Sequence, residues 1–170
     1  MQLSIQQRLA NASLFALALF YIIMLGGGNY EHMNVTPVIA KAPPQSLAML
    51  QGRYGFNPVK FWVTFRPLTI LLFILAIVFN WKLSRQRRKL LIISFATDIA
   101  VTIATFAYFA PEAGAVASGV FNSELVDAQL QARAQLWKHL NSCRLFLFYV
   151  VGVLLLFAVN LNIRSQFAVR

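Results

Sequence analysis

The chain has 170 residues, of which 59% are hydrophobic and only 12% are charged, whereas about a quarter of the residues in an ordinary soluble domain are charged. Its formal net charge of +10 comes from 15 lysine and arginine residues against 5 acidic ones. Because the basic residues cluster at the ends of apolar segments, they predict contact with anionic lipid and exclude nucleic acid as a partner. The single cysteine, Cys143, excludes an intrachain disulfide and Cys-x-x-Cys redox chemistry.

The first apolar segment covers residues 9–27, about the 20 residues that a helix needs to cross ~30 Å of hydrocarbon. It lacks the small-x-small cleavage site of a signal peptide, so we expect it to be retained as a membrane span. Glycines at 26–28 can bend the helix, which we expect to continue from Asn29 until Pro43 and Pro44 stop it.

Two further spans are predicted to form a hairpin. Residues 45–57 mix apolar and polar types and contain two glycines, so they predict an interfacial helix or an ordered loop. Pro58 follows and suits the first turn of the next helix. The second span covers residues 61–81 and the third covers residues 90–109. The loop between them is short and basic, so the two spans must be antiparallel neighbours.

The last span is predicted at residues 143–162. A polar connection from Glu112 to Asp127 precedes it, and Ser123 is the predicted N-cap of a long final helix whose first part stands outside the hydrocarbon. The predicted fold is therefore an all-α, four-helix transmembrane bundle that forms a single membrane domain over residues 1–170.

Basic residues predict the orientation of the bundle. Five of them crowd residues 82–89, and further arginines flank the first and last spans. With four spans these positions share one side of the membrane, which the positive-inside rule makes cytoplasmic. We therefore expect both termini in the cytoplasm, the connections 28–60 and 110–142 outside, and the plasma membrane, the inner membrane of a bacterium, as the location.

Polar residues of the third span lie at helical spacing. Intervals of four and three residues place five side chains on one face of a helix, and these are Asp98, Thr102, Thr105, Phe109 and Glu112. A charge at the centre of a membrane helix costs roughly 2.5 to 3.5 kcal/mol, so this face should look inward and line a pocket. Alternatively, the threonines bond their own helix carbonyls and Asp98 occupies a wet cavity.

Arg66 in the second span needs a partner, because an unpaired arginine about 9 Å below the outer end of its helix is unfavourable. The candidate partners are Glu112, Glu31 and Asp98. Asp98 lies about 18 Å below Ala110 by helix rise, so Glu112 is the easier one to reach. Either an ion pair that locks the bundle or a site for a polar or anionic substrate would explain the arginine.

The first and last helices contribute further candidate pocket residues. In each, a spacing of four, three and four residues defines one face, made by Tyr21, Leu25, Gly28 and His32 in the first and by Trp137, Asn141, Arg144 and Phe148 in the last. Gly28 allows a helix or a ligand to approach closely. Trp137 can stack, Asn141 can donate and accept hydrogen bonds, and Arg144 can hold a carbonyl or a carboxylate.

A few residues near the predicted outer side could bind a metal, namely Glu31, His32, Glu112 and His139. Glu31 and His32 could serve a metal or a proton-transfer pair, and His32 with His139 could hold a haem. Adjacent residues point in different directions on an α-helix, however, and His139 pairs at helical spacing with Cys143 on another side. No cofactor is favoured by this pattern.

Two motifs carry a resemblance to a known family. The motifs Gly28-Asn29-Tyr30-Glu31-His32-Met33, followed by Val35 and Pro37, and Trp137-x-x-x-Asn141-x-x-Arg144 resemble those of small four-helix membrane proteins, largely of unknown function, that include the fungal anthrone oxygenases. The resemblance covers the whole chain in layout. It implies oxidation of an anthrone or a hydroquinone by molecular oxygen without a redox cofactor. His32 would be the base, and the oxyanion would be stabilised by Trp137, Asn141, Arg144 and Arg66.

Two functions therefore remain open. The first is an outward-facing polar pocket for a small hydrophobic, quinone-like or anthrone-like molecule, with oxygenase or oxidoreductase activity. The second is a non-enzymatic accessory or structural subunit that docks onto partner membrane subunits or onto a second copy of itself. Convergence of the polar side chains on one cavity of about 300 Å³ or more would favour the first, and separate close pairs would favour the second.

Overall fold

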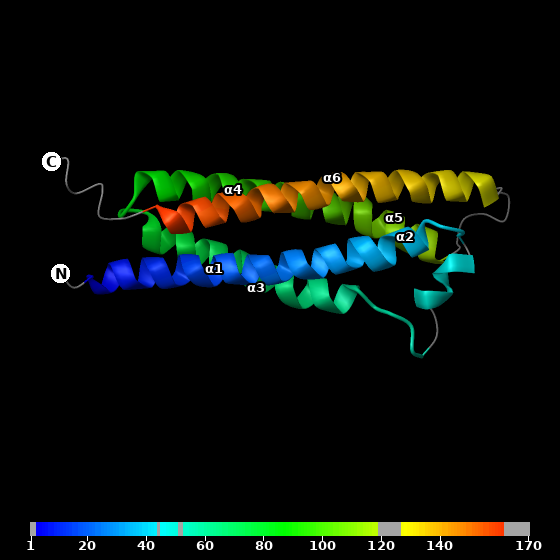
Figure 1. Cartoon of the computed structure of the whole chain (residues 1–170), viewed down its shortest axis with the longest axis horizontal. Coiled ribbons are helices and arrows are strands. Elements are labelled where there is room, and N and C mark those ends of the chain that lie inside the picture. The colour runs from blue at the N-terminus through cyan, green and yellow to red at the C-terminus, as the bar shows by residue number, and fades with distance from the viewer. Residues whose placement is uncertain (1–2, 44, 51–52, 119–126, 162–170) are drawn as a thin grey trace.

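The computed structural model describes residues 3–43, 45–50, 53–118 and 127–161. Four helices in it are long and apolar enough to cross a membrane, and they cover Ile5–Ile39, Val59–Asn80, Arg85–Gly114 and Gln129–Asn160. They stand side by side as a bundle (Figure 1). The described residues contain no strand, and the predicted all-α, four-helix transmembrane fold is confirmed. The chain is therefore an integral membrane protein that crosses the bilayer several times.

The four helices form a closed ring. Helix α1 (Ile5–Tyr30) packs against α3 (Val59–Asn80) and α6 (Asp127–Asn160), and α4 (Arg85–Ala104) packs against the same two helices. The start of α1, the turn between α3 and α4, and the end of α6 lie together (Figure 1). We call this the basic end, because Arg8 and the five basic residues of 82–89 lie there.

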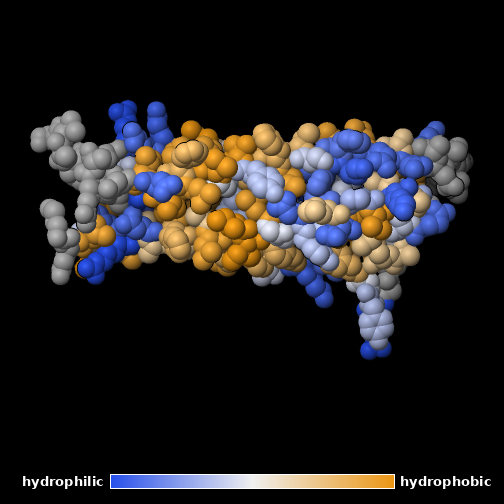
Figure 2. Space-filling view, in the orientation of Figure 1, coloured by the Kyte–Doolittle hydropathy of each residue, from blue (hydrophilic) through white to orange (hydrophobic). Residues whose placement is uncertain are grey.

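Three of the four helices are much longer than the ~30 Å of bilayer hydrocarbon, and α3 nearly matches it. At ~1.5 Å per residue, the 22 residues of α3 cover about 33 Å, whereas the 35 residues of Ile5–Ile39 cover about 52 Å. Since α3 and α4 meet at the basic end, the excess length projects at the opposite end, which we call the distal end. Figure 2 shows the same division, with hydrophobic residues dense near the basic end and in the middle and with hydrophilic ones frequent over the distal part.

The bundle has two apolar cores. The membrane core joins all four helices, and its largest fully buried side chains include Leu14, Leu17, Tyr21, Met24, Phe73, Leu91, Val151 and Leu155. The distal core is smaller and contains Val35, Ile39, Ala40, Phe109, Leu130, Ala134 and Trp137. Between the two cores, α1 and α6 present polar residues instead of apolar ones, so a polar layer separates them.

Two helices widen into π-helical segments in this polar layer. α1 continues into η1 (Glu31–Val35) and then α2 (Thr36–Ile39), and α4 continues into η3 (Thr105–Phe109) and then α5 (Ala110–Ser118). Each π segment ends two residues before a proline, Pro37 or Pro111. A proline within a helix lacks the N–H donor and its ring crowds the carbonyl four residues earlier. The wider π turn relieves that contact while the helix continues.

This widening corrects one expectation. The third helix does not give way to a polar connection after Pro111, because α5 carries it on to Ser118. The other predicted boundaries agree more closely: α1 passes through the glycines at 26–28, and Gln45–Leu50 form a short 3₁₀ helix, η2. The predicted helix start at Ser123 lies outside the described residues.

Candidate functional site

A small cavity occupies the polar layer between the two cores. Residues of α1, η1, α3 and α6 line it, and they are Gly28, Glu31, His32, Trp62, Asn141, Arg144, Leu145 and Phe148. Its volume is about 10 Å³, which is about the space that one buried water needs. The cavity therefore brings together His32, Asn141, Arg144 and Glu31 of the predicted site, but it is far smaller than a ready-made ligand pocket.

The π segment explains why two adjacent residues both line this cavity. On an α-helix Glu31 and His32 would diverge by about 100°. Hydrogen bonds of the π type span one residue more, so each turn contains more residues and neighbouring side chains diverge less. The carboxylate of Glu31 accepts a hydrogen bond from the indole Nε1 of Trp62 at 2.6 Å. This contact ties the first helix to α3 at the level of the cavity.

His32 has a defined arrangement of its two ring nitrogens. Its Nε2 lies 3.3 Å from the hydroxyl oxygen of Ser142, and that hydroxyl donates its only hydrogen to the carbonyl of Lys138 at 3.2 Å. In this arrangement of the hydroxyl hydrogen Ser142 accepts from His32, and the tautomer that fits it carries its ring proton on Nε2. Nδ1 is buried, has no partner within the described part of the chain, and keeps its lone pair.

Asn141 and Arg144 complete the cavity from α6. The amide nitrogen of Asn141 donates to Thr36 Oγ1 at 3.4 Å, while its Oδ1 is buried and finds no partner among the described residues. Arg144 donates from Nη1 to Thr105 Oγ1 at 3.3 Å. Its guanidinium carbon lies 4.7 Å from the ring centroid of Phe109. Both side chains thus contact the walls of the cavity through one polar atom and leave others for a ligand.

Arg66 and Asp98 form a buried ion pair on the side of the cavity that faces the basic end. Nη1 of Arg66 is 2.7 Å from Oδ1 of Asp98, and the Tyr21 hydroxyl donates to the same oxygen at 3.1 Å. All three residues are buried. The guanidinium of Arg66 lies 4.9 Å from the ring centroid of Phe148, which lines the cavity. The pair therefore sits directly behind a cavity wall, and Asp98 does not itself line the cavity.

The expectation that Glu112 is the easier partner for Arg66 is wrong. Glu112 accepts two hydrogen bonds from Arg133 of α6, one from Nε and one from Nη2 at 2.7 Å. The third helix runs on past Pro111 and carries Glu112 into the distal part, where Arg133 is its neighbour and Arg66 is not.

Several other predicted site residues do not line the cavity. Thr102 and Thr105 donate to carbonyls of their own helix, at 2.8 Å and 2.7 Å. This agrees with the alternative interpretation of the polar face of the third helix. Trp137 packs in the distal core and donates to the Phe109 carbonyl at 3.2 Å. His139 is exposed, and its Nδ1 lies 2.7 Å from the carbonyl of Gln135.

The candidate metal ligands are spread over separate contacts. Glu31 is bound to Trp62, Glu112 to Arg133, and His139 to its own helix. Within the residues that the structure describes, no three histidine, cysteine, aspartate or glutamate side chains come close enough together to hold a metal ion.

Three residues of the site were not predicted from the sequence, namely Trp62, Leu145 and Ser142. Trp62 had a detectable signal, because Trp62, Arg66, Thr69 and Phe73 follow the same four, three, four spacing as the faces of the first and last helices. Ser142 and Leu145 had none, because each adjoins a residue of the predicted face, Asn141 or Arg144, and lies outside the four, three, four spacing of that face.

Comparison of the chain with protein-family models, with curated proteins and with solved structures gives no match. The chemistry of the cavity is nevertheless specific. It combines an imidazole lone pair, an amide oxygen without a partner, a guanidinium and a carboxylate, enclosed by Trp62, Phe148 and Leu145.

Proposed function

We propose that this membrane protein binds the polar head of a small hydrophobic aromatic molecule, such as a hydroquinone or an anthrone, and removes a proton from it at His32. The observation that carries the proposal is that His32 Nδ1 and Asn141 Oδ1 are both buried and find no partner among the residues that the structure describes, on two residues that line one cavity. A buried polar atom without a hydrogen bond costs roughly 1 to 3 kcal/mol. Both atoms are acceptors, so the molecule that relieves this cost must donate, as a phenolic hydroxyl does.

The remaining side chains fit the anion that such a proton transfer creates. When Nδ1 takes the phenolic proton, the oxygen becomes an oxyanion that the guanidinium of Arg144 stabilises. Arg66 lies behind Phe148, but its charge is already paired with that of Asp98, so the stabilisation falls to Arg144. A phenolate gives up electrons to molecular oxygen more readily than the neutral phenol. Overall, a hydroquinone and O₂ give a quinone and H₂O₂, or an anthrone and O₂ give an anthraquinone and water.

The small size of the cavity sets a condition on binding. The polar head can replace one water, but the aromatic body needs space that Trp62 and Leu145 now fill. Both side chains are half-buried, so they can turn aside toward the lipid. The ligand would therefore enter from the bilayer, in keeping with a hydrophobic molecule.

Three further features support the proposal. The residues of the resemblance to the family of anthrone oxygenases include His32, Asn141 and Arg144, which meet at the cavity. The basic end carries Arg8 and the loop 82–89, so by the positive-inside rule the termini face the cytoplasm of a bacterial inner membrane. The cavity then lies toward the outer face.

The test uses the purified chain in lipid nanodiscs. Trimethylhydroquinone and anthrone are titrated while the tryptophan fluorescence of a variant that keeps only Trp62, with Trp81→Phe and Trp137→Phe, reports binding and an oxygen electrode reports O₂ uptake. His32→Gln should abolish the uptake. His139→Gln is the matched control, because the chain has two histidines and the second is exposed and bound to its own helix. Equal uptake by the two variants would refute the assignment of His32 as the base.

A second candidate function is a non-enzymatic accessory subunit. The observation in its favour is that Arg66 with Asp98 and Glu112 with Arg133 form separate ion pairs, while the cavity of about 10 Å³ lies far below about 300 Å³. Blue-native electrophoresis of mildly solubilised source membranes tests it. A band much larger than the 19.1 kDa chain supports this function, and migration as a single chain contradicts it.

A further inference from the structure

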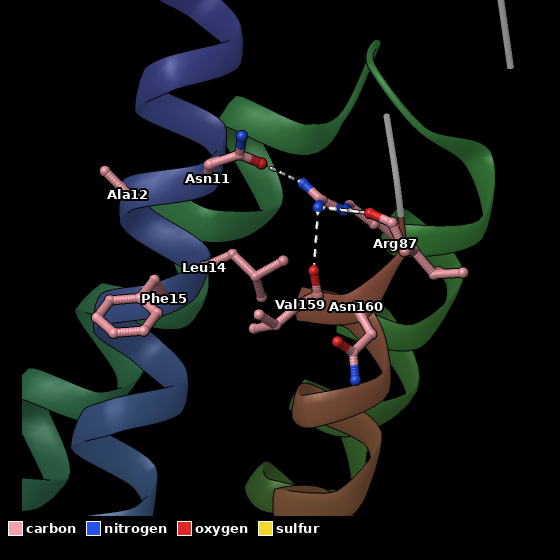
Figure 3. Close-up of a pocket in the computed structure, with 8 residues that line it drawn as sticks. Asn11, Ala12, Leu14, Phe15, Arg87, Val159 and Asn160 are labelled. Carbon is pink, nitrogen blue, oxygen red and sulfur yellow. Dashed lines mark hydrogen bonds between the residues drawn. The ribbon is translucent and has the colours of Figure 1, made fainter. Parts of the chain in front are cut away.

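A second and larger hollow lies at the basic end, between the first and last helices. Its volume is about 570 Å³, within the range of roughly 300 to 1,000 Å³ that is usual for ligand sites. Figure 3 shows Ala12 and Phe15 on the side of α1, Val159 and Asn160 on the side of α6, and Arg87 joining the two. We call this hollow the basic-end groove. It is separate from the cavity at His32.

Arg87 defines the shape of the groove. Its Nη1 donates to Asn11 Oδ1 at 2.7 Å, and its Nε and Nη2 donate to the carbonyl of Leu161 at 3.0 Å and 2.6 Å (Figure 3). This fork caps the end of α6 and holds it at a fixed distance from α1. The buried guanidinium is engaged in these bonds, so it forms the floor of the groove and leaves recognition of a ligand to the rim.

Each wall of the groove combines apolar and amide side chains. Leu14, Phe15 and Val159 supply an apolar surface, while the amides of Asn11 and Asn160 supply hydrogen-bond donors. An occupant that matches both must be amphipathic. A purely apolar chain would leave the amides without partners, and a free ion would leave the apolar wall uncovered.

The charge around the groove indicates the sign of its occupant. None of the five acidic residues of the sequence lies in residues 1–30, 81–97 or 145–170. The same end carries basic side chains that are exposed or half-exposed, namely Arg8, Lys82, Arg85, Arg88 and Lys89. Their potential attracts anionic headgroups and repels cationic ones.

We propose that the basic-end groove binds one anionic phospholipid. An acyl chain lies along Leu14, Phe15 and Val159, and the phosphate lies at the rim, where the amides of Asn11 and Asn160 donate to it and Arg8 adds positive charge. This site is independent of the function proposed for the cavity at His32.

Native mass spectrometry of the full chain, released from detergent, tests the proposal. The two probes are dioleoylphosphatidylglycerol and dioleoylphosphatidylcholine, which share acyl chains and differ in net headgroup charge. We expect one phosphatidylglycerol to be retained roughly tenfold more often than phosphatidylcholine. Excess inorganic phosphate should not displace it, because phosphate lacks the apolar part.

Two matched variants locate the binding. Ala12 and Ala16 are both exposed on α1, but only Ala12 lines the groove. Ala12→Trp fills the groove and should abolish the selective retention, whereas Ala16→Trp should leave it intact. Melting temperatures of the two variants in detergent should match, since neither position is buried.

Three outcomes would overturn the proposal. Equal retention of the two lipids would show that the headgroup is not recognised. Equal retention by the two tryptophan variants would place the lipid elsewhere. Retention of neither lipid would show that the groove holds no phospholipid.

Discussion

Arg66 and Asp98 stand at the same height above the turn that joins α3 to α4. Arg66 precedes the end of α3 at Asn80 by nearly the same stretch of helix as that by which Asp98 follows the start of α4 at Arg85. At ~1.5 Å per residue, both are about 20 Å from that turn, and their charged atoms come within 2.7 Å. The hairpin alone therefore sets the register of the ion pair that lies deep in the bundle.

Breaking this pair from one side should be far more harmful than removing it whole. Arg66→Met leaves a buried carboxylate without its cation, and a loss of about 3 to 5 kcal/mol is expected for such a single change. Combining it with Asp98→Asn removes both charges and leaves an amide oxygen that can still accept from Tyr21. The double variant should recover most of the loss. Titration with sodium dodecyl sulfate measures the free energy of unfolding of each variant. If the loss in the double variant equalled the sum of the losses in the two single variants, the direct pair would be contradicted.

Ser142→Ala should release the ring proton of His32 from Nε2. The hydroxyl is the acceptor that assigns this proton, so without it the two tautomers become closer in energy. Nitrogen-15 NMR of the chain labelled at histidine distinguishes a protonated from an unprotonated ring nitrogen. In the unmodified chain we expect an unprotonated Nδ1 on His32. A signal from His32 that Ser142→Ala does not change would refute the assignment.

Gly28→Ala should weaken ligand binding without unfolding the protein. A Cβ at this position would lie 3.5 Å from Leu145 and 3.6 Å from the Trp62 ring, which is ordinary contact. Replacing glycine in a helix also gains up to about 1 kcal/mol. The methyl group takes the remaining space of the cavity, so the affinity for trimethylhydroquinone should fall at least about tenfold, which is about 1.4 kcal/mol.

Gly26→Ala is the control for this change. It lies two residues away in α1, and a Cβ there would meet nothing within 4 Å. It should share the gain in helix stability and keep the affinity. If the two alanine variants bound the ligand equally well, the ligand would not occupy the cavity beside Gly28.

Arg87→Lys should destabilise the bundle even though the charge is kept. A lysine cannot reproduce the fork that joins Asn11, Val159 and Leu161. Loss of hydrogen bonds from a charged donor costs about 1.5 to 3 kcal/mol. Arg85→Lys, at an exposed position of the same helix, should cost nothing measurable. Thermal unfolding in detergent compares the two, and equal melting temperatures would deny Arg87 this role.

The sequence predicted the four helices because each leaves a long apolar run, and the hairpin was evident from its short basic loop. The partner of Arg66 was missed for an identifiable reason. The depth of Asp98 was counted from Ala110, on the assumption that the helix stops before Pro111. Counted from the hairpin, Asp98 is level with Arg66. The same count from the basic end places Glu112 of the third helix level with Arg133 of the last.

The site was only partly predictable. Helical spacing selected His32, Asn141 and Arg144 together, and all three line the cavity. Spacing also selected Thr102 and Trp137, which do not. A count of residues gives a helix face but not the local width of the helix, and the π segments before Pro37 and Pro111 change how neighbouring side chains diverge. Contacts such as that of Ser142 with His32 depend on the local width of the helix, so the spacing of residues in the sequence does not predict them.

The unbroken α6 has a consequence for how the cavity can open. Of the helices that pass from the membrane core into the distal core, α1 and α4 both change their winding at the level of the cavity, and α6 alone keeps regular α-helical bonding through it. The distal part is thus joined to the membrane core by one regular α-helix, α6, and by two helices that contain π-helical turns. Bending of the distal part would therefore fall on the π-helical turns and would shift His32 of η1, while the regular helix α6 keeps Asn141 and Arg144 in place.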